Sequence, residues 1–230
     1  MNNIKFNKTH DDFGEKVLQV IKQVLPYVKH RLYVGETKGI IPRNMYSPIG
    51  IVDDAIIELY KEHEQTTKDI NKIKFYLFAL SDKKLQRLFK KEKFHKSTLS
   101  TGDILNNELK QLEEKYTVDA NLDLIMEEEL DDISYHQKDF KKTNILYDEA
   151  QEQIVKTLDL TKQNIPLSEK QRLALNNIYH WLPEETSTIL DLFVFGRLTY
   201  CEIANIKQTD EFYIKKSIQG VSNLIRKNIL

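Results

Sequence analysis

Apolar residues along this chain recur mainly three and four positions apart, which is the period of one face of a helix. Alternation of polar and apolar residues, which is typical of strands, continues nowhere for long. Only 7 Gly and 5 Pro occur in 230 residues, so long helical segments are seldom interrupted. With 40% hydrophobic residues, the chain can bury the core of one large domain or of two small ones. We predict an all-α protein with two small helical domains.

Charge is distributed unevenly, although the whole chain carries a net charge of only −1. Residues 1–96 contain 19 Lys and Arg against 12 Asp and Glu, a net charge of +7. Residues 97–166 contain 7 against 16, a net charge of −9, and residues 167–230 contain 8 against 7, a net charge of +1. The chain thus consists of a basic block, an acidic connector and a nearly neutral block, and we expect the three parts to contact different partners or solvent.

Several features of other protein classes do not occur in the sequence. A single Cys cannot form an internal disulfide, so the fold does not depend on an oxidising compartment. The first twelve residues lack the basic segment and apolar run of a secretory signal, and no apolar stretch approaches the roughly 18 residues that span a bilayer. A phosphate-binding loop and a dinucleotide fingerprint are also absent. We expect a cytoplasmic protein that makes no membrane contact, needs no cofactor or metal and is not an enzyme.

The first helix expected in the basic block carries an apolar stripe that a proline interrupts. Pro26 either kinks this helix or begins a second one, and the sequence leaves both alternatives open. The stripe consists of Val17, Leu18, Ile21, Leu25, Val28 and Leu32.

The second helix is expected in IVDDAIIELYKEHE, residues 51–64. Its buried stripe consists of Ile51, Val52, Ala55, Ile56 and Leu59. This leaves Asp54, Ile57, Glu58 and Lys61 on the outward face. An isoleucine among exposed acids indicates either a partner surface or an ordinary solvated face.

The third helix, residues 70–96, combines aromatic and basic side chains. Leu77, Ser81, Leu85 and Leu88 have the spacing of an inward face. A basic stripe on another side consists of Lys83, Lys84, Arg87, Lys90 and Lys91, and the aromatic residues are Phe75, Tyr76, Phe78, Phe89 and Phe94. Stacking of unpaired bases on such rings contributes about 1 to 3 kcal/mol per base, and lysines add salt-sensitive contacts to phosphates. The alternatives are that the rings belong to the core and that the lysines are merely solvated.

The last third of the chain contains helix-start signals and the pattern of a helix-turn-helix. Ser168 with Gln171 and Thr199 with Glu202 are each spaced as a capping box, and Pro183 suits the first turn of another helix. A turn is expected at residues 208–210, before the final helix. The residues spaced to form the helix-turn-helix core are Ile203, Ala204, Ile214, Ile218 and Ile225.

The segment LPEETSTILDLFVFGRLTYCEIANIKQTDEFYIKKSIQGVSNLIRK resembles the C-terminal domain of small bacterial RNA polymerase sigma factors of the extracytoplasmic-function type, within the large sigma-seventy family. The matching residues are Leu182, Pro183, Tyr200, Glu202, Ile203, Ala204, Ile214 and Lys215. Upstream, IVDDAIIELY is similar to the family's helix that binds core polymerase. FYLFALSDKKLQRLFKK is similar to the helix-loop-helix that captures the melted promoter element. The resemblance covers roughly residues 13–96 and 167–228.

The resemblance implies a domain order and three contact surfaces. It implies an N-terminal arm (1–12), a domain for core polymerase and melted promoter (13–96), an acidic linker (97–166) and a helix-turn-helix domain (167–230). Partners would be the clamp and flap of core RNA polymerase and promoter DNA, including the unwound non-template strand. The implied surfaces are Asp53, Asp54, Ile57 and Glu58 for polymerase; Phe75, Tyr76, Lys83, Lys84, Arg87, Lys90 and Lys91 for the melted strand; and Glu211, Phe212, Tyr213, Lys215, Lys216 and Gln219 for upstream DNA or a protein partner.

The acidic connector is unusually long for this family. Its charge repels DNA and suits the basic channel of the polymerase, through which the resemblance implies that the linker runs. Segments at Leu105–Leu112 and Ile145–Leu158 have helical spacing and predict an inserted element. The alternative is a solvated acidic tether.

The final helix carries little positive charge for a DNA reader. Its outward face has two lysines, and Glu211 at its start repels phosphate. We predict a factor that reads the upstream element weakly and is positioned by another DNA-bound protein or guided complex, with Phe212 and Tyr213 as anchors. The alternatives are direct contacts from Lys216 and Gln219 to an unusual sequence, a sigma-like decoy that binds polymerase without initiating, and a helix-turn-helix regulator.

Two enzyme-like groups of residues lack supporting features. Glu128, Glu129, Asp132 and His136 are spaced as metal ligands on a helix would be, but the sequence contains no second convergent set. Cys201 and His180 are a nucleophile and a base by type, but Cys201 lies within the expected helix-turn-helix, where we expect a buried thiol.

Overall fold

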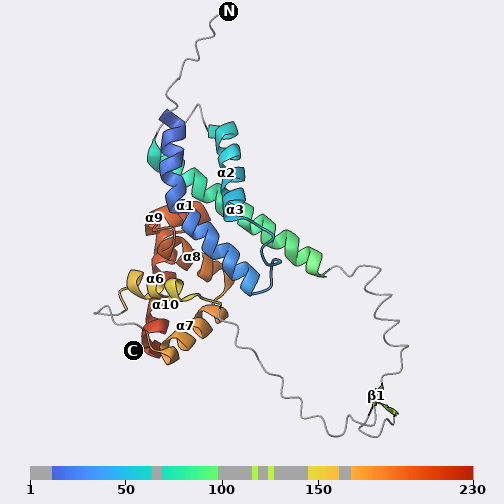
Figure 1. Ribbon diagram of the computed structural model, residues 1–230. Coiled ribbons are helices and arrows are strands. Elements are labelled where there is room, and N and C mark those ends of the chain that lie inside the picture. The colour runs from blue at the N-terminus through green and yellow to red at the C-terminus, as the bar shows by residue number, and fades with distance from the viewer. Residues whose placement is uncertain are drawn as a thin grey trace, which may run out of the picture. The chain divides into compact units, whose positions relative to one another are not determined.

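The computed structural model describes residues 12–63, 69–97, 116–118, 124–126, 145–160 and 167–229, which are almost entirely helical, as predicted (Figure 1). The helices are α1 (Asp12–Thr37), α2 (Pro48–His63), α3 (Ile70–Ser97), α6 (Asp148–Thr157), α7 (Glu169–Trp181), α8 (Glu184–Val194), α9 (Tyr200–Lys207) and α10 (Glu211–Ile229). Two short strands, β1 (Tyr116–Val118) and β2 (Leu124–Met126), pair antiparallel. No helix within the described ranges is both long and apolar enough to cross a bilayer.

The chain forms two compact units. One unit comprises residues 1–92 and 144–230, and the other comprises residues 93–143, which include β1 and β2. Within the first unit we call α1–α3 the front helices and α6–α10 the rear helices. Residues of both expected domains thus lie in one unit, while the division into two domains and its boundaries stay predictions.

Helix α1 continues through Pro26, so a second helix does not begin there. Our prediction of its buried stripe was wrong in one respect, because Leu18 is 64% exposed. The buried face instead contains Val17, Val20, Val24, Tyr27 and Val28. The sequence of α1 holds two overlapping apolar stripes, and packing against α2 and α8 selects the one that is rich in valine.

The inward faces expected on α2 and α3 are confirmed. Val52, Ala55, Leu59, Leu77, Ser81 and Leu85 are all buried, while Ile51, Ile56 and Leu88 are half-buried. Burial of these faces orients the opposite faces of α2 and α3 outward.

Helix α6 corresponds to the segment Ile145–Leu158 that we expected within the acidic connector. It packs against α7 and α8 and belongs to the first unit. The Asn176 side-chain oxygen accepts hydrogen bonds from the backbone N–H of Ile145 and of Leu146 at 2.6 and 3.1 Å. The other segment, Leu105–Leu112, lies outside the described residues.

Two of the rear helices, α9 and α10, form where a helix-turn-helix was expected, with a short turn between them. Both capping boxes are present, at Ser168 with Gln171 and at Thr199 with Glu202. Gln208, which ends α9, has a φ of 54°, a left-handed conformation that glycine adopts at lower cost. Pro183 lies immediately before α8 and not within its first turn. The expected core residues Ile203, Ala204, Ile214, Ile218 and Ile225 are all buried.

Two glycines provide a matched test of this packing. A Cβ on Gly196 would lie 2.5 Å from the Leu192 carbonyl oxygen and 3.0 Å from Phe78 Cε1, whereas a Cβ on Gly220 meets no atom within 4 Å. We expect Gly196→Ala to lower the free energy of unfolding by about 2 kcal/mol. Gly220→Ala in α10 should raise it by about 1 kcal/mol. Urea denaturation followed by circular dichroism measures both, and equal effects would contradict the close approach at Gly196.

Candidate functional site

The outward face of α2 combines acidic and apolar side chains. Asp53, Asp54 and Ile57 are exposed, Ile57 by 53%. Ile49, which the sequence analysis missed, is exposed on the same face, because it lies four and eight residues before Asp53 and Ile57. The face therefore offers two isoleucines beside two carboxylates, a composition that suits a protein partner with basic residues.

Glu58 departs from this description, because it has a partner within the protein. Its carboxylate lies 2.9 Å from Lys84 Nζ of α3, and both side chains are mostly covered. The hydrogen bond from Lys84 lowers the pKa of Glu58. Glu58 and Lys84, which we assigned to two different partners, thus pair with each other and join α2 to α3.

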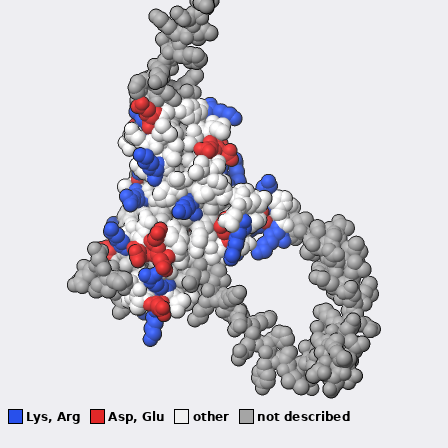
Figure 2. Space-filling model, viewed as in Figure 1, with Lys and Arg blue, Asp and Glu red and all other residues white. Residues whose placement is uncertain are grey.

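The basic stripe on α3 is otherwise exposed. Figure 2 shows Lys and Arg side chains gathered over the C-terminal half of this helix. Lys83, Arg87, Lys90 and Lys91 are exposed there. Because charges spaced three and four apart share one side of a helix, these four residues form a positively charged surface on α3.

The aromatic residues of α3 divide into core and surface. Phe78 and Phe89 are buried, so they belong to the core and not to a stacking surface. Phe75 and Tyr76 are half-buried, and their rings contact each other edge to face at 5.3 Å between centroids. Phe94 is 68% exposed. The aromatic side chains of α3 that reach the surface are therefore those of Phe75, Tyr76 and Phe94.

The outward face of α10 is exposed and poor in positive charge. Its predicted contact residues Glu211, Phe212, Tyr213, Lys215, Lys216 and Gln219 are all exposed. Phe212 is 70% and Tyr213 is 43% exposed, which is unusual for large aromatic side chains. The beginning of α10 thus presents two rings beside one glutamate and two lysines.

A buried polar cluster, which the sequence analysis missed, joins the front and rear helices. Asp191 of α8 accepts hydrogen bonds from Arg31 Nη1 of α1 at 3.0 Å and from the Tyr179 hydroxyl of α7 at 2.9 Å. His30 Nε2 lies 3.3 Å from Asp191 Oδ1 and 3.2 Å from the Tyr179 hydroxyl oxygen. The His30 ring stacks on Phe195, with 3.8 Å between the centroids. All five side chains are buried.

The hydrogen-bond pattern defines the tautomer of His30. The Asp191 carboxylate only accepts, and the single hydroxyl proton of Tyr179 is donated to it. His30 Nε2 must therefore carry a hydrogen, and His30 Nδ1 is buried without a hydrogen-bond partner among the described residues. Arg31 Nε likewise lacks a partner there. Each buried polar atom without a hydrogen-bond partner lowers the free energy of unfolding by about 1 to 3 kcal/mol.

The charges in the cluster shift pKa values in opposite directions. Burial alone would raise the pKa of Asp191, but the polar contacts of His30, Arg31 and Tyr179 lower it below its ordinary value. Burial would lower the pKa of Arg31, but the Asp191 carboxylate raises it. Burial, together with Asp191, raises the pKa of Tyr179. The Asp191 carboxylate is therefore stabilised in its charged form by the polar groups around it.

A second set of polar contacts connects α3 with α9. Asp82 accepts hydrogen bonds from the Tyr27 hydroxyl at 2.8 Å and from Lys207 Nζ at 2.7 Å. Lys74 Nζ lies 2.8 Å from Glu202 Oε1, the same carboxylate group that caps α9. Both ion pairs are less buried than the Arg31 pair, and they tie the first helix of the helix-turn-helix to the front helices.

The enzyme-like groups gain no support from the described residues. Cys201 is exposed and not buried as we expected, because it lies on the outer side of α9, and His180 is also exposed. In the described ranges no three His, Cys, Asp or Glu side chains converge on a metal site. The predicted set Glu128, Glu129, Asp132 and His136 lies outside those ranges.

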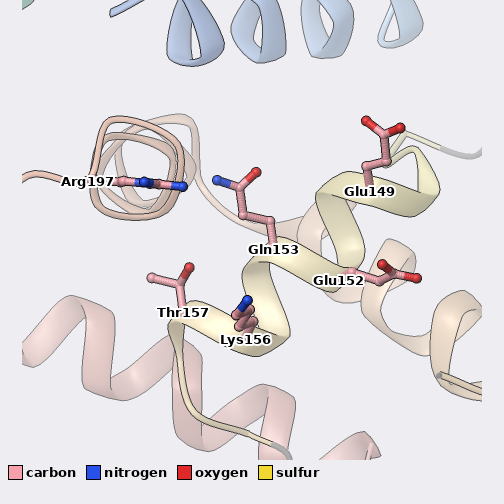
Figure 3. A pocket seen from close by; sticks show the side chains of 6 residues that line it. All are labelled: Glu149, Glu152, Gln153, Lys156, Thr157 and Arg197. Carbon is pink, nitrogen blue, oxygen red and sulfur yellow. The ribbon is translucent and has the colours of Figure 1, made fainter. Parts of the chain in front are cut away.

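A shallow pocket lies between α6 and the loop after α8 (Figure 3). Its lining residues are Glu149, Glu152, Gln153, Lys156, Thr157 and Arg197. The carboxylates of Glu149 and Glu152 point away from Arg197 in Figure 3. The pocket therefore lacks a convergent set of charged groups.

No family model, no curated protein and no solved structure matches this chain.

The pairing of Asp191 predicts a pH-dependent contribution to stability. A carboxyl group whose pKa is lowered on folding stabilises the protein above its unfolded-state pKa, here near 3.8, and this stabilisation is lost as the pH falls through the folded-state value. Asp191→Asn should lower the free energy of unfolding by about 3 to 5 kcal/mol at pH 7, because Arg31 keeps a buried charge without its counterion. Urea denaturation at pH 7 and below pH 3.8 should show a smaller difference at the lower pH. The control is Asp53→Asn on the exposed face of α2, and an equal loss in both variants would contradict the role of Asp191.

Proposed function

We propose that this chain is a sigma-like factor that binds core RNA polymerase and promoter DNA and directs the start of transcription. One observation supports this function. The three surfaces expected to contact partners are all exposed, while the opposite faces of the same helices are buried within one unit. These surfaces are the acidic face of α2, the basic stripe of α3 and the outward face of α10. Such a factor acts in the cytoplasm and catalyses no reaction itself.

The polymerase contact is assigned to α2. Asp53 and Asp54 carry the negative charge that suits basic residues on a polymerase clamp. Ile57, on the same exposed face, supplies apolar area for the contact. Glu58 of α2 is already paired with Lys84 of α3, so its carboxylate contributes less to the contact with polymerase. The pair instead holds α2 against α3.

The contact with the melted strand is assigned to α3. Lys83, Arg87, Lys90 and Lys91 bind phosphates in this proposal, and the half-buried rings of Phe75 and Tyr76 offer edges against which a flipped base packs. The acidic segment between α3 and α6 would follow a basic channel of the polymerase. Lysine contacts make the affinity for the strand fall with increasing salt.

The rear helices contact upstream DNA weakly and a DNA-bound protein or guided complex more strongly in this proposal. Exposed aromatic residues are common anchors of protein interfaces, and Phe212 and Tyr213 stand at the beginning of α10, where Glu211 disfavours phosphate. The polymerase flap is the other protein partner expected for this region.

The first test mixes the full chain with purified core polymerase and a premelted promoter. We expect a stable ternary complex and transcripts from the wild-type protein. Asp54→Lys combined with Ile57→Ala should weaken core binding about tenfold or more, because it reverses one charge and removes apolar area from the same face. Glu149→Lys, an exposed charge reversal on α6, is the control and should bind core normally.

Two other outcomes would contradict initiation. Binding to core with suppressed transcription would indicate a decoy or adaptor. A chain that ignores core polymerase but binds duplex DNA would indicate a helix-turn-helix regulator.

The second test concerns the partner of α10. Phe212→Ala with Tyr213→Ala should abolish recruitment to the promoter in cells while changing the DNA affinity of the full chain by less than about threefold, since no phosphate contact is removed. Lys216→Ala with Gln219→Ala is the matched pair on the same helix. Greater loss of promoter-specific binding in that second variant would favour direct base contacts over a recruiting protein.

A further inference from the structure

One side of α10 carries a partly apolar stripe that lies beside its buried face. The stripe consists of Tyr213, Ser217, Gly220 and Leu224, and each of these residues immediately precedes a buried residue of the same helix. Intervals of four, three and four residues are the spacing of the seam along which two helices pair in a coiled coil. Tyr213 and Leu224 are 43% and 45% exposed, so both ends of the stripe offer apolar area to a partner.

The middle of the stripe permits a second helix to approach closely. A Cβ on Gly220 would meet no atom within 4 Å, so packing inside the protein does not require glycine at this position. Glycine also weakens the interior of a helix relative to alanine. We attribute Gly220 to contact with another molecule, which can reach the α10 backbone at Gly220 and at the small Ser217 one turn earlier.

The stripe is complementary to itself in one antiparallel register. In this register Ser217 of one copy lies opposite Gly220 of a second copy. The same register places Tyr213 of each copy opposite Leu224 of the other. The two helices therefore cross at their small residues, and a tyrosine packs against a leucine on each side of the crossing. Antiparallel helices also have favourably arranged dipoles.

Charges at the two ends of α10 favour the same arrangement. Asp210 and Lys227 are exposed, and the register that pairs Ser217 with Gly220 brings them opposite each other at both ends of the contact. The backbone N–H of Phe212 donates to Asp210 Oδ1 at 3.3 Å, which holds this carboxylate at the start of the helix. Parallel pairing would instead place Lys227 beside Lys227. A second copy of this chain thus fits the stripe in charge as well as in shape.

We propose that this chain forms a two-fold symmetric dimer through antiparallel pairing of α10. The same stripe contributes from both copies, as symmetric dimers require. A single pair of helices covers less area than the roughly 1,600 Å² of a standard stable interface, so the dimer is weak and dissociates reversibly.

The dimer regulates access to α10, a consequence that rests on the proposed function. Pairing covers Tyr213, which we assigned to upstream DNA or a recruiting protein, and it brings Lys216 beside Asn223 of the other copy. A partner that needs Tyr213 and Lys216 therefore binds only the monomer. Binding of that partner and dimerisation oppose each other, because each removes the species that the other requires.

Sedimentation equilibrium of the full chain over a wide range of concentration tests the dimer without reference to transcription. Gly220→Glu should weaken self-association about tenfold or more, because it places a carboxylate where the two helices cross. The same change should raise the free energy of unfolding, since glutamate is a better helix former than glycine. Opposite changes in the two measurements exclude misfolding as the cause of a lost dimer.

The matched control is Leu18→Glu, which replaces an exposed leucine on α1. It should self-associate like the wild-type protein. A wild-type protein that stays monomeric at every concentration, or equal self-association of the wild-type and Gly220→Glu proteins, would overturn the dimer.

Cross-linking tests the register. Antiparallel pairing brings Lys216 of one copy beside Asn223 of the other and keeps the two Asn223 side chains apart. In a Cys201→Ser background, a mixture of Lys216→Cys and Asn223→Cys proteins should react with a short bis-maleimide about fivefold faster than Asn223→Cys alone. Equal rates, or faster cross-linking of Asn223→Cys alone, would contradict antiparallel pairing.

The last test concerns regulation. Leu224→Glu lies outside the residues assigned to DNA or to a recruiting protein and should weaken the dimer. At concentrations where the wild-type protein is mostly dimeric, this variant should form the complex with core polymerase and promoter DNA at about threefold lower total concentration. An equal requirement for both proteins would overturn the regulatory consequence. If neither protein binds core polymerase, the proposed function fails, and sedimentation still decides whether the dimer exists.

Discussion

The pair of Arg31 and Asp191 fixes how the helices of the main unit are arranged. A charge that is buried without its counterion costs several kcal/mol, so α1 and α8 have little freedom to slide or rotate against each other. The same carboxylate orients Tyr179 and, through it, the ring of His30. Gly196 then allows the end of α8 to approach Phe78 closely. The outward faces of α2, α3 and α10 are exposed because these contacts determine which faces point inward.

Sequence periodicity was sufficient to predict the helices and most of their buried faces. The capping boxes at Ser168 and Thr199 depend only on residues three apart, and both form as expected. Leu18 was misplaced because α1 carries two overlapping apolar stripes and only its neighbours decide between them. The helix at Ile145–Leu158 was expected from its spacing, but its packing on α7 and α8 was not, because spacing within one helix does not identify the helices that it contacts.

The candidate site was less predictable, because charge pairing depends on residues far apart in the chain. Asp191 within an apolar run, and Arg31 on a mostly apolar helix face, each indicate a buried charge with a partner, but the 160 residues between them conceal that they pair with each other. Lys84 and Glu58 show the same effect. Each has the spacing of an outward, partner-binding position, yet the nearest opposite charge lies on the adjacent helix of the same protein. The exposed residues of the α3 stripe and of α10 were placed correctly, since exposure follows from helix periodicity alone.

Ion pairs within the main unit reduce the positive charge that the protein presents on its surface. Arg31, Lys74, Lys84 and Lys207 are each held by a carboxylate of the same unit, so a count of basic residues overstates the charge offered to DNA. The α3 stripe, with Lys83, Arg87, Lys90 and Lys91 exposed, therefore presents more positive charge than the outward face of α10, which has two lysines beside Glu211.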